Sequence, residues 1–251
     1  MGSHFPRPRG FVGEKRMATY VIGDIHGEYE QLKTLVQKMQ LKETDELYVL
    51  GDVMDRGPES VKCLRHLMSM PNCACIAGNH ELMMLSNMKL LLREISDELL
   101  EGLSETDMGL LLDWMNNGGT TTMKEFSALS PEERKEILDF VGDFDIFFDL
   151  EVNGQKYLLV HAGINHFSKD KDLYDYDIDD FVWVRPDYEK AYYDDVIVIS
   201  GHTPTQLIPG NPNPGYIYRK NNHIGMDCGA FAAEGRLAGI CLETGEEFYS
   251  R

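Results

Sequence analysis

Short apolar runs alternate with amphipathic stretches through the first third of the chain. Three runs have the length and composition of buried strands, at residues 19–22, 47–50 and 74–77. Between them, residues 29–39 and 58–68 carry apolar side chains at helical spacing, and Pro58 suits the first turn of the second helix. This order predicts right-handed crossovers and parallel strands, as in α/β proteins.

The middle of the chain has a different pattern, with leucine and methionine side chains at helical spacing. We predict a helical insertion over about residues 82–142, with a loop at residues 114–121. Ser130, followed by proline, is typical of a helix N-cap. Strand-like runs then return, and residues 216–226 have the pattern of a hairpin, so the last third predicts a mixed or antiparallel sheet.

Residues 1–16 are rich in glycine, proline and basic side chains and show no periodicity. We interpret them as a disordered tail or a cloning remnant, and residues 17–251 as a single domain that carries the insertion. No apolar run approaches the ~20 residues that cross a bilayer, and no apolar N-terminal segment resembles a secretory signal. These features predict a cytoplasmic protein without a membrane partner, and they leave its oligomeric state open.

The charge balance limits the partners of the protein. Its 42 acidic and 24 basic residues give a formal net charge of −18, which disfavours binding to nucleic acid and to anionic membranes. A small phosphate ester remains compatible, because two bound divalent cations would reverse the local field.

Carboxylate, imidazole and amide side chains follow several of the strand-like runs. They lie in five glycine-containing blocks, at residues 23–27, 51–57, 78–81, 161–163 and 201–203. Since ligands collect at the carboxyl ends of parallel strands, we expect these groups to meet. Asp24 and His26 flank one residue and can point to the same side of an extended strand end, and the Asp52 carboxylate can bridge two cations. The series predicts a two-metal hydrolase.

The candidate metal ligands form a mixed oxygen and nitrogen set: Asp24, His26, Asp52, Asn79, His161 and His202. Such a set suits manganese, with iron or zinc as alternatives, better than calcium or magnesium. Alternatively, Asp24, Asp52 and Asn79 only cap the helices that follow them, because Asp and Asn favour that position. The histidines at matching strand ends favour the metal interpretation.

The ordered blocks resemble those of the phosphoprotein phosphatase family, within the calcineurin-like metallophosphoesterases. The resemblance runs from about residue 18 to residue 203 and implies mixed β-sheets packed as a sandwich and flanked by helices. It also implies that Asp24, His26 and Asp52 hold a first metal ion. The second metal ion would be held by Asp52, Asn79, His161 and His202.

The resemblance further implies roles in catalysis. His80 would protonate the departing alkoxide, and Asp55 would orient its imidazole. Arg56, Arg185 and Asn79 would contact the phosphoryl oxygens, although Arg185 lies in a shorter motif than the family has. Guanidinium groups suit this task, because a phosphoryl transition state spreads negative charge over its oxygens.

The substrate class depends on a few positions. In the resembled family, symmetrical diadenosine tetraphosphate hydrolases usually carry alanine and aspartate where this chain has Asp55 and Glu81. With the pattern from Trp114 to Thr122, this favours a phosphoserine/phosphothreonine protein phosphatase that also accepts small phosphoesters, acting by in-line attack of a metal-bridging hydroxide. The alternatives are a symmetrical diadenosine tetraphosphate hydrolase and an inactive binding scaffold. Ala77 stands where the family often has arginine, so phosphate is bound more weakly or another residue replaces that contact.

Overall fold

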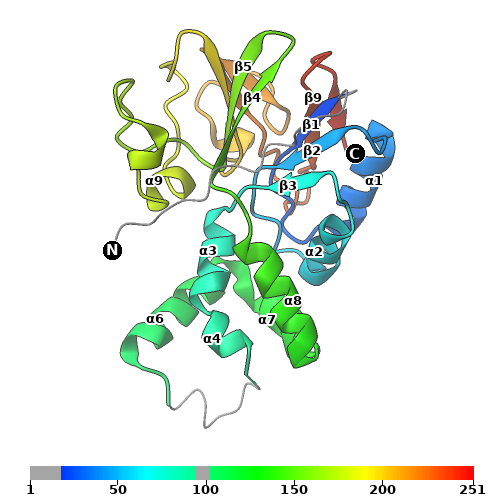
Figure 1. The fold of residues 1–251 in the computed structure, drawn as a ribbon, viewed down its shortest axis with the longest axis vertical. Coiled ribbons are helices and arrows are strands. Elements are labelled where there is room, and N and C mark those ends of the chain that lie inside the picture. The colour runs from blue at the N-terminus through cyan, green and yellow to red at the C-terminus, as the bar shows by residue number, and fades with distance from the viewer. Residues whose placement is uncertain (1–17, 94–101) are drawn as a thin grey trace.

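Two five-stranded β-sheets form the centre of the protein, in a computed structural model that describes residues 18–93 and 102–251 (Figure 1). In the first sheet, the parallel strands β1, β2 and β3 are joined by β9, which pairs antiparallel with both β1 and β10, in the order β10-β9-β1-β2-β3. These strands are β1 Thr19–Ile22, β2 Glu46–Val49, β3 Cys73–Cys75, β9 Ala238–Cys241 and β10 Glu247–Tyr249. The parallel pairing of the first three strands confirms the predicted α/β order.

The second sheet is mixed and has the order β4-β5-β6-β8-β7. Its strands are β4 Phe147–Val152, β5 Gln155–Val160, β6 Val196–Ser200, β7 Tyr218–Lys220 and β8 His223–Gly225. Asn153-Gly154 and Asn221-Asn222 join its two hairpins, and all four residues have the positive φ that two-residue hairpin turns favour. The prediction of a mixed sheet is confirmed, except that β9 and β10 join the first sheet.

Apolar side chains leave the strands on both faces. On β1, Val21 packs between the two sheets, whereas Ile22 packs on the helical side; on β2, Tyr48 and Val49 divide in the same way. The core between the sheets draws residues from both of them. Strands that are buried on both faces read as continuous apolar runs, which explains the pattern in the sequence. The sandwich that the resemblance implied is therefore present.

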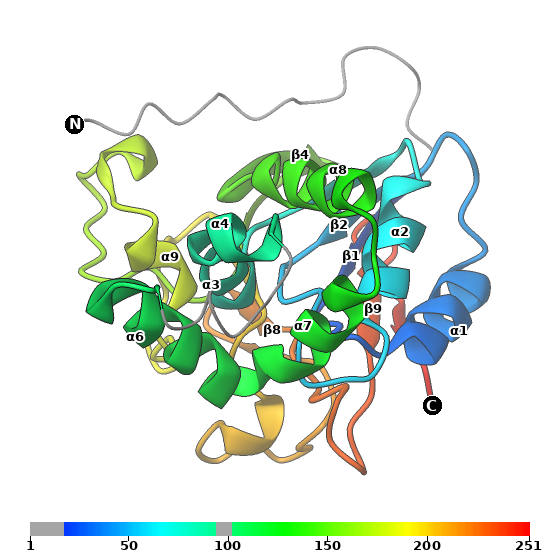
Figure 2. The ribbon, with the colours of Figure 1, turned by 90° about the horizontal axis from the view of Figure 1, so that it is seen from below.

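Helices cover the first sheet and extend below both sheets (Figures 1 and 2). The first sheet is flanked by α1 (Tyr29–Met39) and α2 (Ser60–Met68), whose apolar faces join its core. The insertion contains α3 Asn79–Ser86, α4 Met88–Leu91, α6 Glu105–Trp114, α7 Thr120–Ser127 and α8 Pro131–Gly142. The short helix α9 (Asp179–Val182) packs on the second sheet. Within the described residues, no helix is both long enough and apolar enough to span a membrane.

Two details of the helices differ from the prediction, and one agrees with it. Helix α2 begins at Ser60, so Pro58 lies before the helix and not in its first turn. The Glu125 carboxylate accepts the N–H groups of Ser60 and Val61 at 2.7 and 3.2 Å, which satisfies the helix start from outside its own sequence. Ser130 caps α8 as predicted, accepting the third helical N–H at 3.2 Å.

The predicted loop at residues 114–121 is the second difference, because Trp114, Thr120 and Thr121 lie in helices and the helical path breaks only at a kink at Gly118. A π-helical turn, Met115–Gly119, joins α6 to α7. Gly118 has a φ of 104°, and a Cβ at this position would lie 2.8 Å from Cγ of Arg56. A Cβ on Gly119 would lie 2.5 Å from Nε1 of Trp114. The two glycines suggested a loop in the sequence. In the structure, their lack of a Cβ allows this turn to pack closely against neighbouring side chains.

The imidazole of His223 on β8 is buried and stays neutral in the folded protein. Burial lowers its pKa to about 3, and its Nε2 shares a 2.9 Å hydrogen bond with the Ser200 hydroxyl. The unfolded chain protonates this histidine below about pH 6.5, whereas the folded chain does not. Lowering the pH from 7 to 5 should therefore remove about 2 kcal/mol of unfolding free energy through this residue. Urea unfolding at both pH values should show a smaller loss for His223→Phe, and an equal loss would contradict the assignment.

Candidate metal centre and active site

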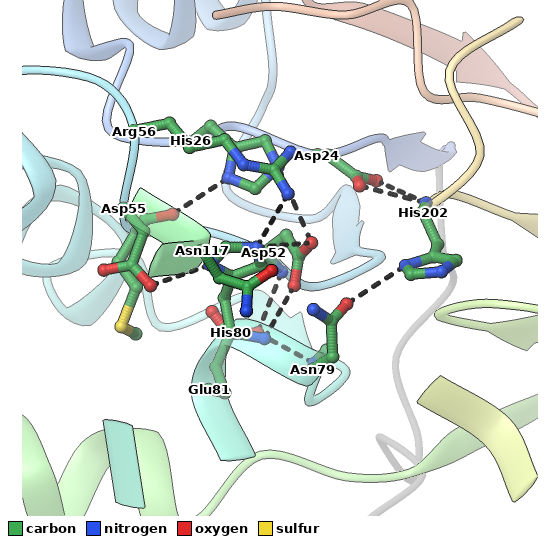
Figure 3. Close-up of polar contacts among 12 residues, drawn as sticks. Asp24, His26, Asp52, Asp55, Arg56, Asn79, His80, Glu81, Asn117 and His202 are labelled. Carbon is green, nitrogen blue, oxygen red and sulfur yellow. Dashed lines mark hydrogen bonds and ion pairs between the residues drawn. The ribbon is translucent and has the colours of Figure 1, made fainter. Parts of the chain in front are cut away.

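The polar blocks meet where loops from both sheets come together (Figure 3). Five site residues have left-handed backbone conformations, with φ between 47° and 67°: His26, Asp52, Asp55, Arg56 and His202. Such conformations cost roughly 1–3 kcal/mol each and concentrate at functional sites. The expectation that Asp24 and His26 leave an extended strand end is wrong, because β1 ends at Ile22 and a turn carries the histidine. Neither Asp24 nor Asp52 is the N-cap residue of a helix.

Three imidazoles each donate one ring N–H to a backbone carbonyl, which fixes the tautomer. The donor–acceptor pairs are His26 Nδ1 with Met54 (3.0 Å), His161 Nδ1 with Leu50 (2.7 Å) and His202 Nε2 with Trp183 (3.1 Å). The opposite nitrogen of each ring is then an acceptor directed into the site, and that of His26 accepts a hydrogen bond from Arg56. Metal-binding histidines have this arrangement, because the outer hydrogen bond orients the ring.

The carboxylate, amide and imidazole atoms of the candidate ligands that face one another inside the site are acceptors. The Asp52 carboxylate lies 3.6 Å from His26 Nε2 and 3.5 Å from His161 Nε2. The Asn79 amide oxygen lies 3.1 Å from His161 Nε2 and 3.0 Å from His202 Nδ1. In two groups of residues, the atoms that could bind a metal ion lie within 4.8 Å of one another. One group is His26, Asp52 and His80, and the other is Asp52, His161 and His202. Lone pairs that converge in this way fit two divalent cations that share Asp52.

The protonation states suit metal binding. Burial lowers the pKa of His26 and of His161, and burial together with the neighbouring His161 lowers the pKa of His202 to about 4. Burial acts to raise the pKa of Asp52, but the surrounding histidines hold it well below its usual range. Neutral imidazoles and an ionised carboxylate are the forms that bind metal, so these four residues need release few protons for binding near pH 7.

Asp24 contributes a second buried carboxylate to the site. Both of its oxygens accept the backbone N–H of His202, at 3.1 and 2.9 Å, and a Cβ on Gly201 would lie 2.0 Å from one of them. Burial, with Asp227 and Asp52 close by, raises the pKa of Asp24 well above its usual value. Like charges gathered away from water are costly unless a cation joins them, which is a second indication of metal binding.

Glu81 holds the loops of the site together. Its buried carboxylate accepts the backbone N–H groups of Asp52, Val53 and Gly78, at 2.8, 2.9 and 2.7 Å. Burial, with Asp52 nearby, raises its pKa to about 7. In the sequence, Glu81 served only to distinguish substrate classes. In the structure, Glu81 fixes the backbone of the second metal-binding block relative to that of the third.

Asp55 and His80 form a buried pair that the helical insertion completes. The His80 Nδ1–H donates to Asp55 Oδ2 at 2.7 Å, and the Trp114 indole N–H donates to the same oxygen at 2.7 Å. The Thr122 hydroxyl donates to the other oxygen at 2.5 Å. The sequence pattern from Trp114 to Thr122 was noted, but nothing in its periodicity indicates these contacts, because they join residues about 60 positions apart.

Replacing Trp114 by phenylalanine should destabilise the protein by about 1–3 kcal/mol, because a buried carboxylate loses a donor. Urea unfolding measures this change. Trp183→Phe is the matched control, since the Trp183 side chain is 43% exposed. A loss no larger than that of the control would contradict the role assigned to the indole N–H.

Arg56 extends its guanidinium into the site. One of its terminal nitrogens donates to Nε2 of His26 at 2.8 Å, and the other lies 2.9 Å from Nε2 of His80 (Figure 3). The Phe231 ring lies against the guanidinium, with its centroid 4.7 Å from Cζ. Phe231 was not predicted from the sequence. Because its ring is 40% exposed, it presents an aromatic face beside the arginine.

Arg185 is another of the expected phosphate contacts. Arg185 is exposed, and its charge acts on the pKa of His202. Ala77 is buried, and its N–H donates to the carbonyl of Asp145 at 2.8 Å, so this position brings no cation to the site. Arg56 is thus the cation that the structure places among the candidate ligands.

The two-sheet sandwich and its cluster of buried carboxylate, imidazole and amide groups are the features of a metallophosphoesterase fold. A model of the calcineurin-like phosphoesterase family matches residues 17–230, and the chain belongs to this family. The family match covers most of the chain and all of the candidate site residues.

Curated relatives share part of the sequence. A symmetrical bis(5'-nucleosyl)-tetraphosphatase of Erwinia tasmaniensis is 38% identical over 102 residues, which is 39% of this chain and 37% of the relative. An enzyme of the same description from Salmonella paratyphi C is 35% identical over 129 residues, 50% of this chain and 43% of the relative. The chain thus matches less than half the length of these relatives. They carry the activity that was the alternative prediction, not that of a protein phosphatase.

Solved structures share the fold. One, described provisionally as a diadenosine tetraphosphatase, has a TM-score of 0.62 and 16% identity and covers 92% of each chain. A metallophosphoesterase from Sphaerobacter thermophilus has a TM-score of 0.53 and 16% identity, covering 94% of this chain and 87% of its own. At this identity the likeness concerns the fold alone.

Proposed function

We propose that this hydrolase binds two divalent cations where its two sheets meet and cleaves a phosphorus–oxygen bond there. One cation would be held by Asp24, His26 and Asp52, and the other by Asp52, Asn79, His161 and His202. The observation that supports this most directly is the set of unprotonated imidazole nitrogens and amide and carboxylate oxygens that converge on one another. The mixed donors favour manganese, with iron or zinc as alternatives.

Different residues of the chain would bind the phosphoryl group and protonate the leaving group. Bound divalent cations would supply Lewis-acid polarisation of the phosphoryl oxygens and would lower the pKa of water. Arg56, joined by Arg185 and by the Asn79 amide, would bind the phosphoryl oxygens, whose charge grows in the transition state. His80 would donate a proton to the leaving group through Nε2, and Asp55 would keep that nitrogen directed into the site.

We propose dinucleoside tetraphosphates as the first substrate class. The activity of the curated relatives supports this choice. In a symmetrical cleavage the leaving group is a nucleoside diphosphate, which is weakly basic and depends little on an acid. The exposed Phe231 ring beside Arg56 offers a face on which a nucleobase can stack.

A phosphate monoester, such as phosphoserine or phosphothreonine in a protein, is the second candidate. The specific observation in its favour is the buried pair of Asp55 and His80, with the insertion donating to Asp55. The alkoxide that leaves from a serine or threonine ester is a strong base, so it needs a positioned acid. An enzyme that released only nucleoside diphosphates would gain less from this pair.

One set of rate measurements separates the candidates. Values of kcat/KM for diadenosine tetraphosphate, a phosphoserine peptide and a phosphotyrosine peptide should be compared with manganese present. We expect the dinucleotide to be preferred by about 100-fold or more, which is about 2.7 kcal/mol of transition-state discrimination. A preference of that size for a peptide would instead assign the monoester function. A protein that binds manganese but hydrolyses none of the three would be the inactive scaffold.

A further inference from the structure

Asp227 is a buried carboxylate that the assigned roles leave unexplained. It follows strand β8, and its side chain is 1% exposed. One oxygen, Oδ1, accepts the backbone N–H of Gly229 at 2.8 Å. The other oxygen, Oδ2, is buried and has no hydrogen-bond partner among the described residues.

The surroundings of Asp227 place it beside the metal-binding blocks. The carbonyl oxygen of the preceding residue, Met226, would lie 2.5 Å from a Cβ on Gly23, the residue directly before Asp24. The Asp227 carbonyl accepts the N–H of Thr205, three residues beyond His202. The backbone of Asp227 is therefore packed between the first and the last of the candidate metal-binding blocks.

The charged groups that act on this carboxylate also belong to the site. Asp227 is the nearby charge with the largest effect on Asp24, and Asp227 itself responds to Asp52, Arg56 and Arg185. The carboxylate is therefore close enough to Asp24 for the two charges to interact. No role was assigned to this position from the sequence.

Neither protonation state of Asp227 is satisfied by the protein alone. A protonated Oδ2 would be a buried hydroxyl donor without an acceptor, and an ionised one would be a buried negative charge close to two other carboxylates. A divalent cation next to Asp24 satisfies the ionised form and removes the repulsion between the carboxylates.

We propose that Asp227 is a further acidic residue of the metal centre and supports the cation held by Asp24 and His26. This inference rests on the metal binding in the proposed function, but it does not depend on the substrate or on turnover. The residue would act by adding negative charge beside the first cation. Outer carboxylates of this kind typically change metal affinity by about 10–100-fold.

Asp227→Asn tests the proposal, because asparagine can keep the acceptor for the Gly229 N–H while it removes the charge. Manganese binding should be measured by isothermal titration calorimetry on the metal-free protein. We expect one of the two site affinities, that of the cation held by Asp24 and His26, to fall by about 10–100-fold. The metal-free variant should also melt at a higher temperature than the metal-free parent, because the repulsion with Asp24 is gone. A purely structural carboxylate would lower that melting temperature instead.

Asp149→Asn is the matched control, since Asp149 lies on strand β4 and outside the metal-binding blocks. It should bind manganese as the parent does. Asp227→Ala provides a second variant that removes both the charge and the Gly229 contact. Manganese affinity within threefold of the parent in either variant would overturn the proposal. A parent that binds manganese without hydrolysing any phosphoester would refute the proposed function while leaving this test intact.

Discussion

Replacing His80 by asparagine is expected to lower kcat for an alkyl phosphate monoester by about 10²–10⁴-fold. Burial acts to lower the pKa of His80, but the charge of Asp52 and the hydrogen bond to Asp55 raise it above its ordinary value. A histidine with a raised pKa can carry the proton that an alkoxide needs. Asparagine keeps a polar side chain of similar reach but has no proton to transfer.

The loss should depend on the leaving group. With p-nitrophenyl phosphate or a dinucleoside tetraphosphate, the departing group is weakly basic, so His80→Asn should lose far less of its rate. Manganese content should be measured on the same samples, because His80 also lies within the group formed with His26 and Asp52. His166→Asn, at an exposed histidine, is the control. Equal losses on all three substrates with full metal content would remove His80 as the acid.

Replacing Asp52 by asparagine should have the largest effect on metal binding, because this carboxylate is common to both groups of candidate ligands. A neutral amide cannot bridge two cations, and the imidazoles of His26 and His161 would lose the charge between them. We expect the metal content to fall from about two ions per chain to below one. The value of kcat/KM should fall by more than about 10³-fold, or about 4 kcal/mol.

Elemental analysis of purified protein that has been equilibrated with manganese measures the first effect directly. Asp170→Asn, at an exposed aspartate, is the control and should keep both ions. Prolonged chelation of the parent should reproduce the loss of activity, and added manganese should restore it. Full activity of the parent after exhaustive chelation would refute the two-metal interpretation.

Periodicity located the elements of the first third because apolar side chains there report burial. The strand at residues 19–22 and the helix at residues 29–39 coincide with β1 and α1. The hydrogen-bonded pairing of these strands ends before the run of buried residues does, however. Leu50 and Ala77 are buried but lie beyond the last residues of β2 and β3. Apolar runs therefore overestimate how far these strands extend toward the site.

The types of residue in the sequence identified the candidate ligands. The backbone conformations and packing that bring these ligands together could not be predicted from neighbouring residues in the sequence. The left-handed conformation of His26 and Asp52 depends on loops that pack against each other, and the indole of Trp114 reaches Asp55 only through the packed insertion. Asp227 could have been found. It follows a strand-like run and precedes Cys228 and a glycine, the pattern that marked the other blocks.

The pairing of β1 with β9 joins residues near opposite ends of the described chain, such as Tyr20 and Cys241. Contacts between such distant positions form slowly, because a long loop must close before they contribute. During synthesis, β1 would emerge well before the strand that covers its outer edge. Until β9 arrives, that edge exposes unpaired N–H and C=O groups, a hazard for association with other chains. The time needed to synthesise the residues between β1 and β9 thus sets how long this edge of β1 remains unpaired.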